Sequence, residues 1–240
     1  MAQGDAPRDI GADAATESDD LDRLRRRLAN VIGHALRTPA ATVRGQAEIL
    51  AQTSDPQERD AAVAALRRAS RRLEEMIDEV LVVQGLGTRL PTGSPRELDV
   101  DAEVRAVADA LEVVEEIELT GEPGVVITAA RDALRWALRA VLDNAGRYGT
   151  GPVRVEVATT PTGTRLAVWT PAGGVGATDD DVRLAFEPFY RGERAVTVTA
   201  TRLGLGLTAA REVVDDLGGR VWLERDEEHG IISYLELPRA

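Results

Sequence analysis

The stretch VIGHALRTP, residues 31–39, decides how the first part of the chain is interpreted. It lies in a helical pattern over residues 21–53, where apolar side chains recur every three or four positions. His34 and Thr38 are one helical turn apart and therefore share a face. Pro39 falls inside this pattern, although proline within a helix costs about 3 kcal/mol and normally causes a kink. A lone helical histidine is usually an ordinary solvated side chain, and these two features argue against that reading.

Two long helices are predicted around this stretch. The first covers residues 21–53, Ser54-Asp55-Pro56 breaks it, and the second covers residues 57–84. The second helix carries a coiled-coil seam of apolar and small side chains. The seam consists of Val63, Leu66, Ser70, Leu73, Ile77 and Val80. A single antiparallel hairpin leaves such a seam half uncovered, so we expect a second copy to complete a four-helix bundle as a homodimer.

The chain is predicted to have four parts. Residues 1–20 have almost no large apolar groups and indicate a disordered acidic tail. The hairpin covers residues 21–85, a Gly- and Pro-rich linker covers 86–97, and a mixed domain covers 98–240. We expect helices over about 101–114, 131–147 and 205–217, and strands near 116–119, 125–128, 152–159, 164–170, 219–225 and 230–237. The fold class is α+β, with mostly antiparallel strands and helices on one face.

Composition excludes several kinds of function. The formal net charge is −12, which argues against nucleic acid as a partner, since binding requires a basic face. The chain has no cysteine, two histidines and no lysine, so we expect no disulfide, no zinc site and no lysine-dependent mechanism. It contains no long apolar run and no leader, so we expect a cytoplasmic protein without membrane insertion.

Residues 31–39 resemble the phosphoacceptor box of histidine kinases, in which a histidine precedes an acidic residue and then Leu-Arg-Thr-Pro. The resemblance implies that His34 is phosphorylated and that Thr38 positions water in members with phosphatase activity. Ala35 stands where the family has a carboxylate that orients the imidazole and takes its proton. Loss of a positioned base typically costs about 10²–10⁴-fold in rate.

Residues 134–148 resemble the asparagine box of the ATP-binding domain in the GHKL superfamily (gyrase, Hsp90, histidine kinases and MutL). The resemblance implies that Asn144 ligates a Mg²⁺ ion bridging the phosphates of ATP. It also implies that Arg147 is directed at phosphate and that Tyr148 lies beside the adenine. Ala140 replaces the first asparagine of the box. The alternative is an amphipathic helix with a capping asparagine.

The next box of the family reads Asp-x-Gly-x-Gly, and here it aligns with residues 170–174. Thr170 replaces the aspartate that accepts the adenine amino group's hydrogen bond, and Ala172 replaces the first glycine. Gly174 remains. A hydroxyl is a weaker acceptor than a carboxylate, whose hydrogen bonds are worth about 1.5–3 kcal/mol. Weak adenine recognition is therefore expected.

Two further boxes follow in the family's order. Residues 186–191, FEPFYR, resemble the phenylalanine box that anchors the ATP lid, which implies that Arg191 reaches the γ-phosphate. In residues 203–207, LGLGL, Gly204 and Gly206 match the glycine box, where backbone N–H groups approach phosphate at a helix start. Arg202 replaces an earlier glycine of this box.

Three functions remain open at this stage. The first is a two-component histidine kinase that takes phosphate from Mg-ATP and passes it to an aspartate of a response-regulator receiver domain, impaired by its missing residues. The second is a non-catalytic or phosphatase-type dimeric protein that binds a regulator or a partner kinase. The third is a dimeric histidine phosphotransfer protein. An upstream sensor protein is a further candidate partner, because no sensor domain is recognised.

Overall fold

The computed structural model describes residues 10–83, 93–114, 116–149, 151–170, 178–192, 203–226 and 230–238, with side chains described from Val31 onward. The chain divides into two compact units, Met1–Glu74 and Glu75–Ala240. Across the described residues, every helix is too short or too polar to cross a membrane.

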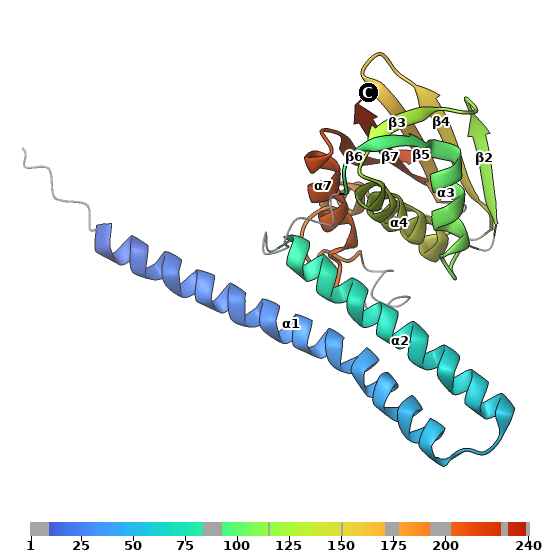
Figure 1. The fold of residues 1–240 in the computed structure, drawn as a ribbon. Coiled ribbons are helices and arrows are strands. Elements are labelled where there is room, and N and C mark those ends of the chain that lie inside the picture. Colours follow the sequence, from blue (N-terminus) through green and yellow to red (C-terminus); the bar gives the residue numbers. More distant parts are fainter. Residues whose placement is uncertain are drawn as a thin grey trace, which may run out of the picture. The chain divides into compact units, whose positions relative to one another are not determined.

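The first unit is built on an antiparallel helical hairpin, as predicted (Figure 1). Helix α1 spans Ile10–Gln52 and helix α2 spans Pro56–Val83. Asp55 caps α2 through its Oδ1 atom, which accepts a hydrogen bond of 3.0 Å from the Gln57 N–H. Pro56 is the first residue of α2, where its missing N–H removes no helical hydrogen bond.

Helix α1 starts earlier than predicted and continues through its proline. Residues 10–20 are helical in the structure, whereas the sequence predicts a disordered tail. That prediction rested on the lack of large apolar groups, but alanine-rich segments form helix by local propensity without burial. Pro39 lies inside α1 and is buried.

The two faces of α2 differ in burial. Ala62 and Ala69, seven positions apart, are 2% and 7% exposed and form the stripe that faces the inside of the hairpin. Leu66 and Leu73 of the predicted seam lie beside this stripe and are only half-buried. On α1, Val31 is 46% exposed. The hairpin thus leaves apolar surface uncovered within one chain.

The second unit contains a five-stranded sheet in the order β2-β4-β5-β7-β6. Its strands are β2 Ile117–Gly121, β4 Val153–Thr159, β5 Gly163–Thr170, β6 Arg220–Asp226 and β7 Gly230–Pro238. Strand β2 runs parallel to β4, and the other neighbours are antiparallel, as expected. A separate antiparallel pair joins β1 Arg96–Asp99 to β3 Val126–Ala129.

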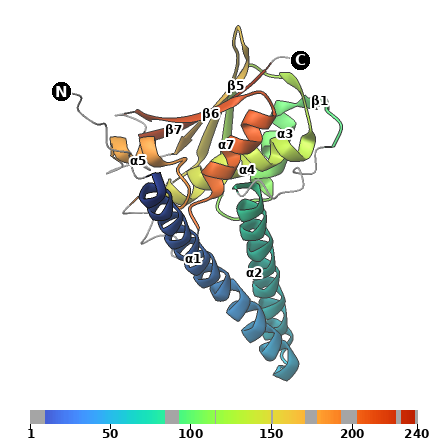
Figure 2. The same cartoon turned by 90° about the vertical axis from the view of Figure 1, so that its left-hand side faces the viewer.

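Helices cover one face of this sheet (Figure 2). They are α3 Val100–Asp109, α4 Arg131–Tyr148 and α7 Gly206–Asp216. Helix α4 packs on β4 and β5, α7 packs on β6, and the two helices pack on each other. The core between them is aliphatic. It includes Val104, Leu134, Leu138, Leu142, Val155, Leu166, Val168 and Leu235.

A buried carboxylate on α3 pairs with two partly exposed arginines on α4. Glu103 is 3% exposed, and its carboxylate lies 2.9 Å from Nε of Arg131 and 2.5 Å from Nε of Arg135. Removing one partner of such a pair is more destabilising than the pair itself is stabilising, because a buried charge is left uncompensated.

Three elements differ from the sequence-based expectation. Strand β1 includes residues 96–97, which the sequence assigned to the linker. A four-residue strand is too short to show a clear alternation of apolar and polar residues. Helix α3 ends at Asp109 rather than near residue 114. A Cβ atom on Gly146 would lie 2.4 Å from the Val113 carbonyl, so the chain after α3 turns to pass against α4. Helix α5, Asp179–Leu184, was not expected.

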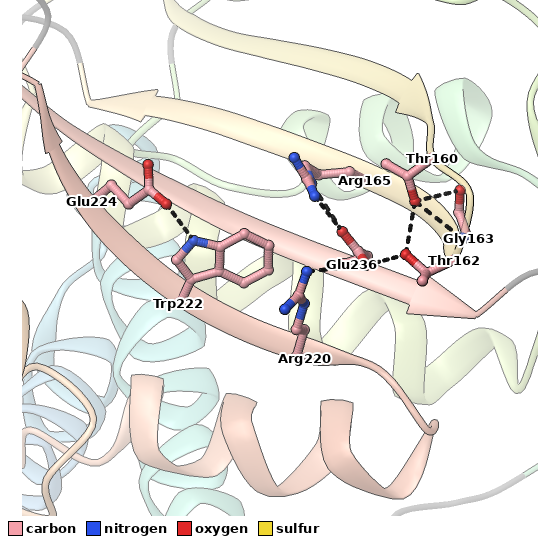
Figure 3. Close-up of polar contacts among 8 residues, drawn as sticks. All are labelled: Thr160, Thr162, Gly163, Arg165, Arg220, Trp222, Glu224 and Glu236. Carbon is pink, nitrogen blue, oxygen red and sulfur yellow. Dashed lines mark hydrogen bonds and ion pairs between the residues drawn. The ribbon is translucent and has the colours of Figure 1, made fainter.

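The opposite face of the sheet carries a network of polar and aromatic side chains (Figure 3). Arg165, Glu236 and Arg220 are register partners on β5, β7 and β6. Glu236 is 5% exposed and accepts hydrogen bonds from Thr162 Oγ1 at 2.7 Å and Arg165 Nε at 2.9 Å. The Thr162 hydroxyl, and then the arginines, hold the pKa of Glu236 below its ordinary value. Trp222 lies under the guanidinium groups of both arginines.

Candidate functional site

The candidate phosphoacceptor lies on the exposed side of α1. His34 and Thr38 are both exposed, one turn apart, and Ala35 between them is half-buried. The Thr38 carbonyl accepts a 3.2 Å hydrogen bond from the Thr42 hydroxyl. The imidazole is thus accessible to a second reactant, and the residue after it offers no acid–base group.

Helix α4 carries the three asparagine-box residues in its last two turns. Asn144 and Tyr148 are half-buried. Arg147 Nε lies 3.0 Å from both carboxylate oxygens of Asp143, which is 6% exposed. Asp143 was not singled out from the sequence, although a carboxylate four residues before an arginine is a recognisable helical pair.

The phenylalanine and glycine boxes are in direct contact. The Phe189 N–H donates a 3.0 Å hydrogen bond to the Gly204 carbonyl. Phe189 has φ 66°, a left-handed conformation that bulky residues rarely adopt. Gly204 also has positive φ, and a Cβ atom there would lie 2.6 Å from the Tyr190 carbonyl. Only glycine permits this approach, which brings Arg191 beside the glycine box.

The glycine box leads directly into α7. Leu203 and Leu205 are 1% exposed and anchor the box in the interior. Gly206 is the first residue of α7, and the preceding residue provides no side-chain cap. The first turn of α7 carries no acidic residue. Glu79, which is 7% exposed, lies at this helix start, because its Oε1 atom would be 3.5 Å from a Cβ atom on Gly206. The N-terminus of α7 therefore has an acidic neighbour from α2.

Thr170 ends β5 on its inner face and is 1% exposed. Its Oγ1 atom makes no hydrogen bond within the part of the chain that the structure describes. Ala172, Gly174, Arg202 and His229 lie outside the described residues. A buried hydroxyl of this kind is normally paired with water or a ligand.

The aspartates after this box have hydrogen-bond partners within the chain. Asp179 accepts a hydrogen bond from Arg225 at 3.1 Å, and Asp180 accepts one from Arg183 at 2.9 Å. Asp181 accepts from Thr178 and Tyr190. The Asp181 contacts were missed, although Thr-x-x-Asp at residues 178–181 is the signature of a capping box that starts a helix.

Residues 24–85 match the His Kinase A (phospho-acceptor) domain, and residues 129–240 match the family described as Histidine kinase-, DNA gyrase B-, and HSP90-like ATPase. Together, these two matches identify a two-component histidine kinase core. This kinase core has the two domains of the family in their expected order.

The curated relatives agree with this assignment, and the solved structures agree with the fold. The sensor protein kinase WalK of Staphylococcus aureus is 23% identical over 93% of this chain. The chain spans 56% of that protein and 38% of the WalK of strain Newman. The histidine kinase AdeS of Acinetobacter baumannii has TM-score 0.60 at 21% identity, covering 86% of this chain and 98% of that one. Full-length ShkA in complex with AMPPNP has TM-score 0.60 at 21% identity, covering 90% and 46%.

Proposed function

We propose that this kinase core phosphorylates His34 from Mg-ATP and passes the phosphoryl group to an aspartate of a response-regulator receiver domain. The observation that carries the proposal is the exposed His34, one turn before Thr38, in a hairpin that matches the phospho-acceptor domain. The contact between Phe189 and Gly204 supports the proposal. It joins the phenylalanine box to the glycine box, and both boxes would lie beside the nucleotide phosphates.

The chemistry of the first step is a phosphoryl transfer to nitrogen. A lone pair on an imidazole nitrogen of His34 forms a bond to the γ-phosphorus. The bond from that phosphorus to the bridging oxygen breaks, and ADP leaves with its electrons. The other ring nitrogen then loses its proton to water, because Ala35 supplies no carboxylate to take it.

We assign the nucleotide contacts to residues of the second unit. The Asn144 amide would hold Mg²⁺, which neutralises charge on the phosphates when bound. Among the described residues, no group of three or more His, Cys, Asp or Glu could hold a metal. Phosphate oxygens and water would supply most of the Mg²⁺ ligands. The other assigned residues are Arg147, Tyr148, Gly174, Gly204, Gly206 and Arg191.

The kinase reaction is expected to be slow. Ala35 removes the base, and Ala140 removes one asparagine of the box. Thr170 offers adenine a neutral acceptor where a carboxylate would bind more strongly. These departures lower rate and affinity without removing the acceptor histidine itself.

A phosphatase-type role is the second candidate. Thr38 is retained and exposed, whereas the carboxylate needed for efficient kinase chemistry is absent. In that role the hairpin, as a homodimer, would bind a phosphorylated regulator, and Thr38 would orient the attacking water. The third candidate is a phosphotransfer role, in which His34 accepts phosphate from a regulator without ATP.

Calorimetry with AMPPNP and Mg²⁺ separates the first role from the other two. We expect weak binding that is lost in Asn144→Ala, because the metal ligand is gone. Asp109→Ala, a change at the exposed end of α3, is the control and should leave binding unchanged. Wild-type protein that binds no nucleotide would favour the phosphatase or phosphotransfer role.

A further inference from the structure

Asp181 is the centre of a hydrogen-bonded cluster at the start of α5. Its Oδ2 atom accepts from the Thr178 N–H at 2.7 Å and from the Thr178 hydroxyl at 2.8 Å. The Asp181 N–H donates back to the Thr178 hydroxyl at 3.1 Å, which completes a capping box. The other oxygen, Oδ1, accepts a 2.9 Å hydrogen bond from the Tyr190 hydroxyl. One carboxylate therefore ties α5 to the phenylalanine box.

The same oxygen also lies against Gly192. A Cβ atom on Gly192 would lie 2.3 Å from Asp181 Oδ1, so any other residue would displace the carboxylate. Tyr190 and Gly192 are the residues immediately before and after Arg191. Asp181 thus contacts both neighbours of this arginine.

The opposite side of the segment is held by the glycine box. The Phe189 N–H bonds to the Gly204 carbonyl, and the Tyr190 carbonyl lies against Gly204. The left-handed conformation of Phe189 is strained, and such strain persists only where the surroundings enforce it.

The protonation states suit this contact. The backbone hydrogen bond from Thr178 is the main cause that lowers the pKa of Asp181, which keeps the carboxylate ionised. Desolvation, and then the bond to Asp181, raises the pKa of Tyr190, so the phenol keeps the proton that it donates.

We propose that Asp181 is the positioning residue for Arg191: it bonds the Tyr190 hydroxyl on one side and packs against Gly192 on the other, so that the Arg191 guanidinium stays directed at the γ-phosphate. This role rests on the proposed function, in which Arg191 contacts that phosphate. It assigns Asp181 no contact with the nucleotide itself.

The test measures how well the full chain distinguishes a triphosphate from a diphosphate. Calorimetry gives the ratio of the Kd for Mg-ADP to the Kd for Mg-AMPPNP, which reports the γ-phosphate contact. We expect Arg191→Gln to lower this ratio. Asp181→Asn and Tyr190→Phe should each lower it by about fivefold, as for the loss of one hydrogen bond, with the Mg-ADP affinity unchanged. Asp180→Asn, on the same turn and exposed, is the matched control.

The outcomes are distinguishable. Combining Asp181→Asn with Arg191→Gln should add no further loss, since both act through one contact. A ratio that falls in Arg191→Gln but holds in Asp181→Asn and Tyr190→Phe would overturn the positioning role. Tyr190→Phe removes a single hydroxyl and guards against misfolding of the Asp181 variant. A ratio unchanged in Arg191→Gln, or no binding of either nucleotide, would instead overturn the proposed function and this role with it.

Discussion

On α4, both carboxylate oxygens of Asp143 lie 3.0 Å from Nε of Arg147, one helical turn later. This bond uses Nε, so the terminal nitrogens of the guanidinium keep the fork geometry that suits phosphate. Asp143 is buried and Arg147 is 30% exposed, which makes the pair partly shielded from solvent. We interpret Asp143 as the group that orients Arg147.

Asp143→Ala should therefore weaken both the fold and nucleotide binding. Loss of a buried hydrogen bond to a charged group lowers the free energy of unfolding by about 1–3 kcal/mol. Denaturant unfolding measures this change, and calorimetry with Mg-AMPPNP measures the affinity. Asp132→Ala, exposed in the first turn of the same helix, should lower stability by less than about 1 kcal/mol and leave affinity unchanged. Equal effects of the two variants would contradict the orienting role.

Thr170→Asp should raise nucleotide affinity. The Thr170 hydroxyl is buried without a partner among the described residues, and a carboxylate there would accept the adenine amino hydrogen bond. A charged acceptor is worth about 1.5–3 kcal/mol, so calorimetry should show about a tenfold gain or more. The free variant should melt at a lower temperature, because an unpaired carboxylate is buried.

Thr164→Asp is the control for this change. Thr164 is buried near the start of β5, at the end opposite Thr170, and its replacement should destabilise the fold without raising affinity. Tight binding by the wild-type protein, or an unchanged affinity in Thr170→Asp, would show that another group recognises the adenine.

Glu236 should make the second unit sensitive to acid. Its pKa is lowered in the folded state, so its stabilising contribution is present above the ordinary glutamate value near 4.5. The contribution is lost as pH falls below that value through the lower folded pKa. Denaturant unfolding of Glu236→Gln should show a stability deficit at pH 7 that shrinks below about pH 4. Glu118→Gln, on the exposed side of β2, should show no such pH-dependent deficit.

The uncovered seam of the hairpin predicts a dimer. The double variant Leu66→Glu with Leu73→Glu would place charge in the expected bundle core. Sedimentation of this variant should then find monomers. Ala61→Glu with Ala64→Glu adds the same charge on the exposed outer side of α2 and should stay dimeric. A dimer that survives the leucine substitutions would contradict the bundle.

Much of the fold was predictable because its elements are long and periodic. Helix α4 begins and ends within a residue of its expected bounds, and the β4–β5 hairpin forms around Pro161-Thr162-Gly163. Asp55 and Pro56 mark the start of the second hairpin helix through ordinary capping chemistry. Each of these signals is local in sequence.

The contacts around the site were not predictable in the same way. The pairing of Tyr190 with Asp181 depends on how the chain between them folds back, and Gly192 appears in sequence as an ordinary loop glycine. Helix α5 has six residues and follows a glycine-rich stretch, so only its capping box marked it. The contact of Phe189 with Gly204 depends on tertiary packing.

Phosphate incorporation on His34 tests the central claim most directly. Purified chain incubated with Mg-ATP labelled at the γ-phosphate should gain acid-labile label that is absent from His34→Gln. Ala35→Glu should raise the rate, since it restores the base next to the acceptor. Label on His229, or no label in Ala35→Glu while Mg-ATP is demonstrably bound, would contradict the kinase assignment.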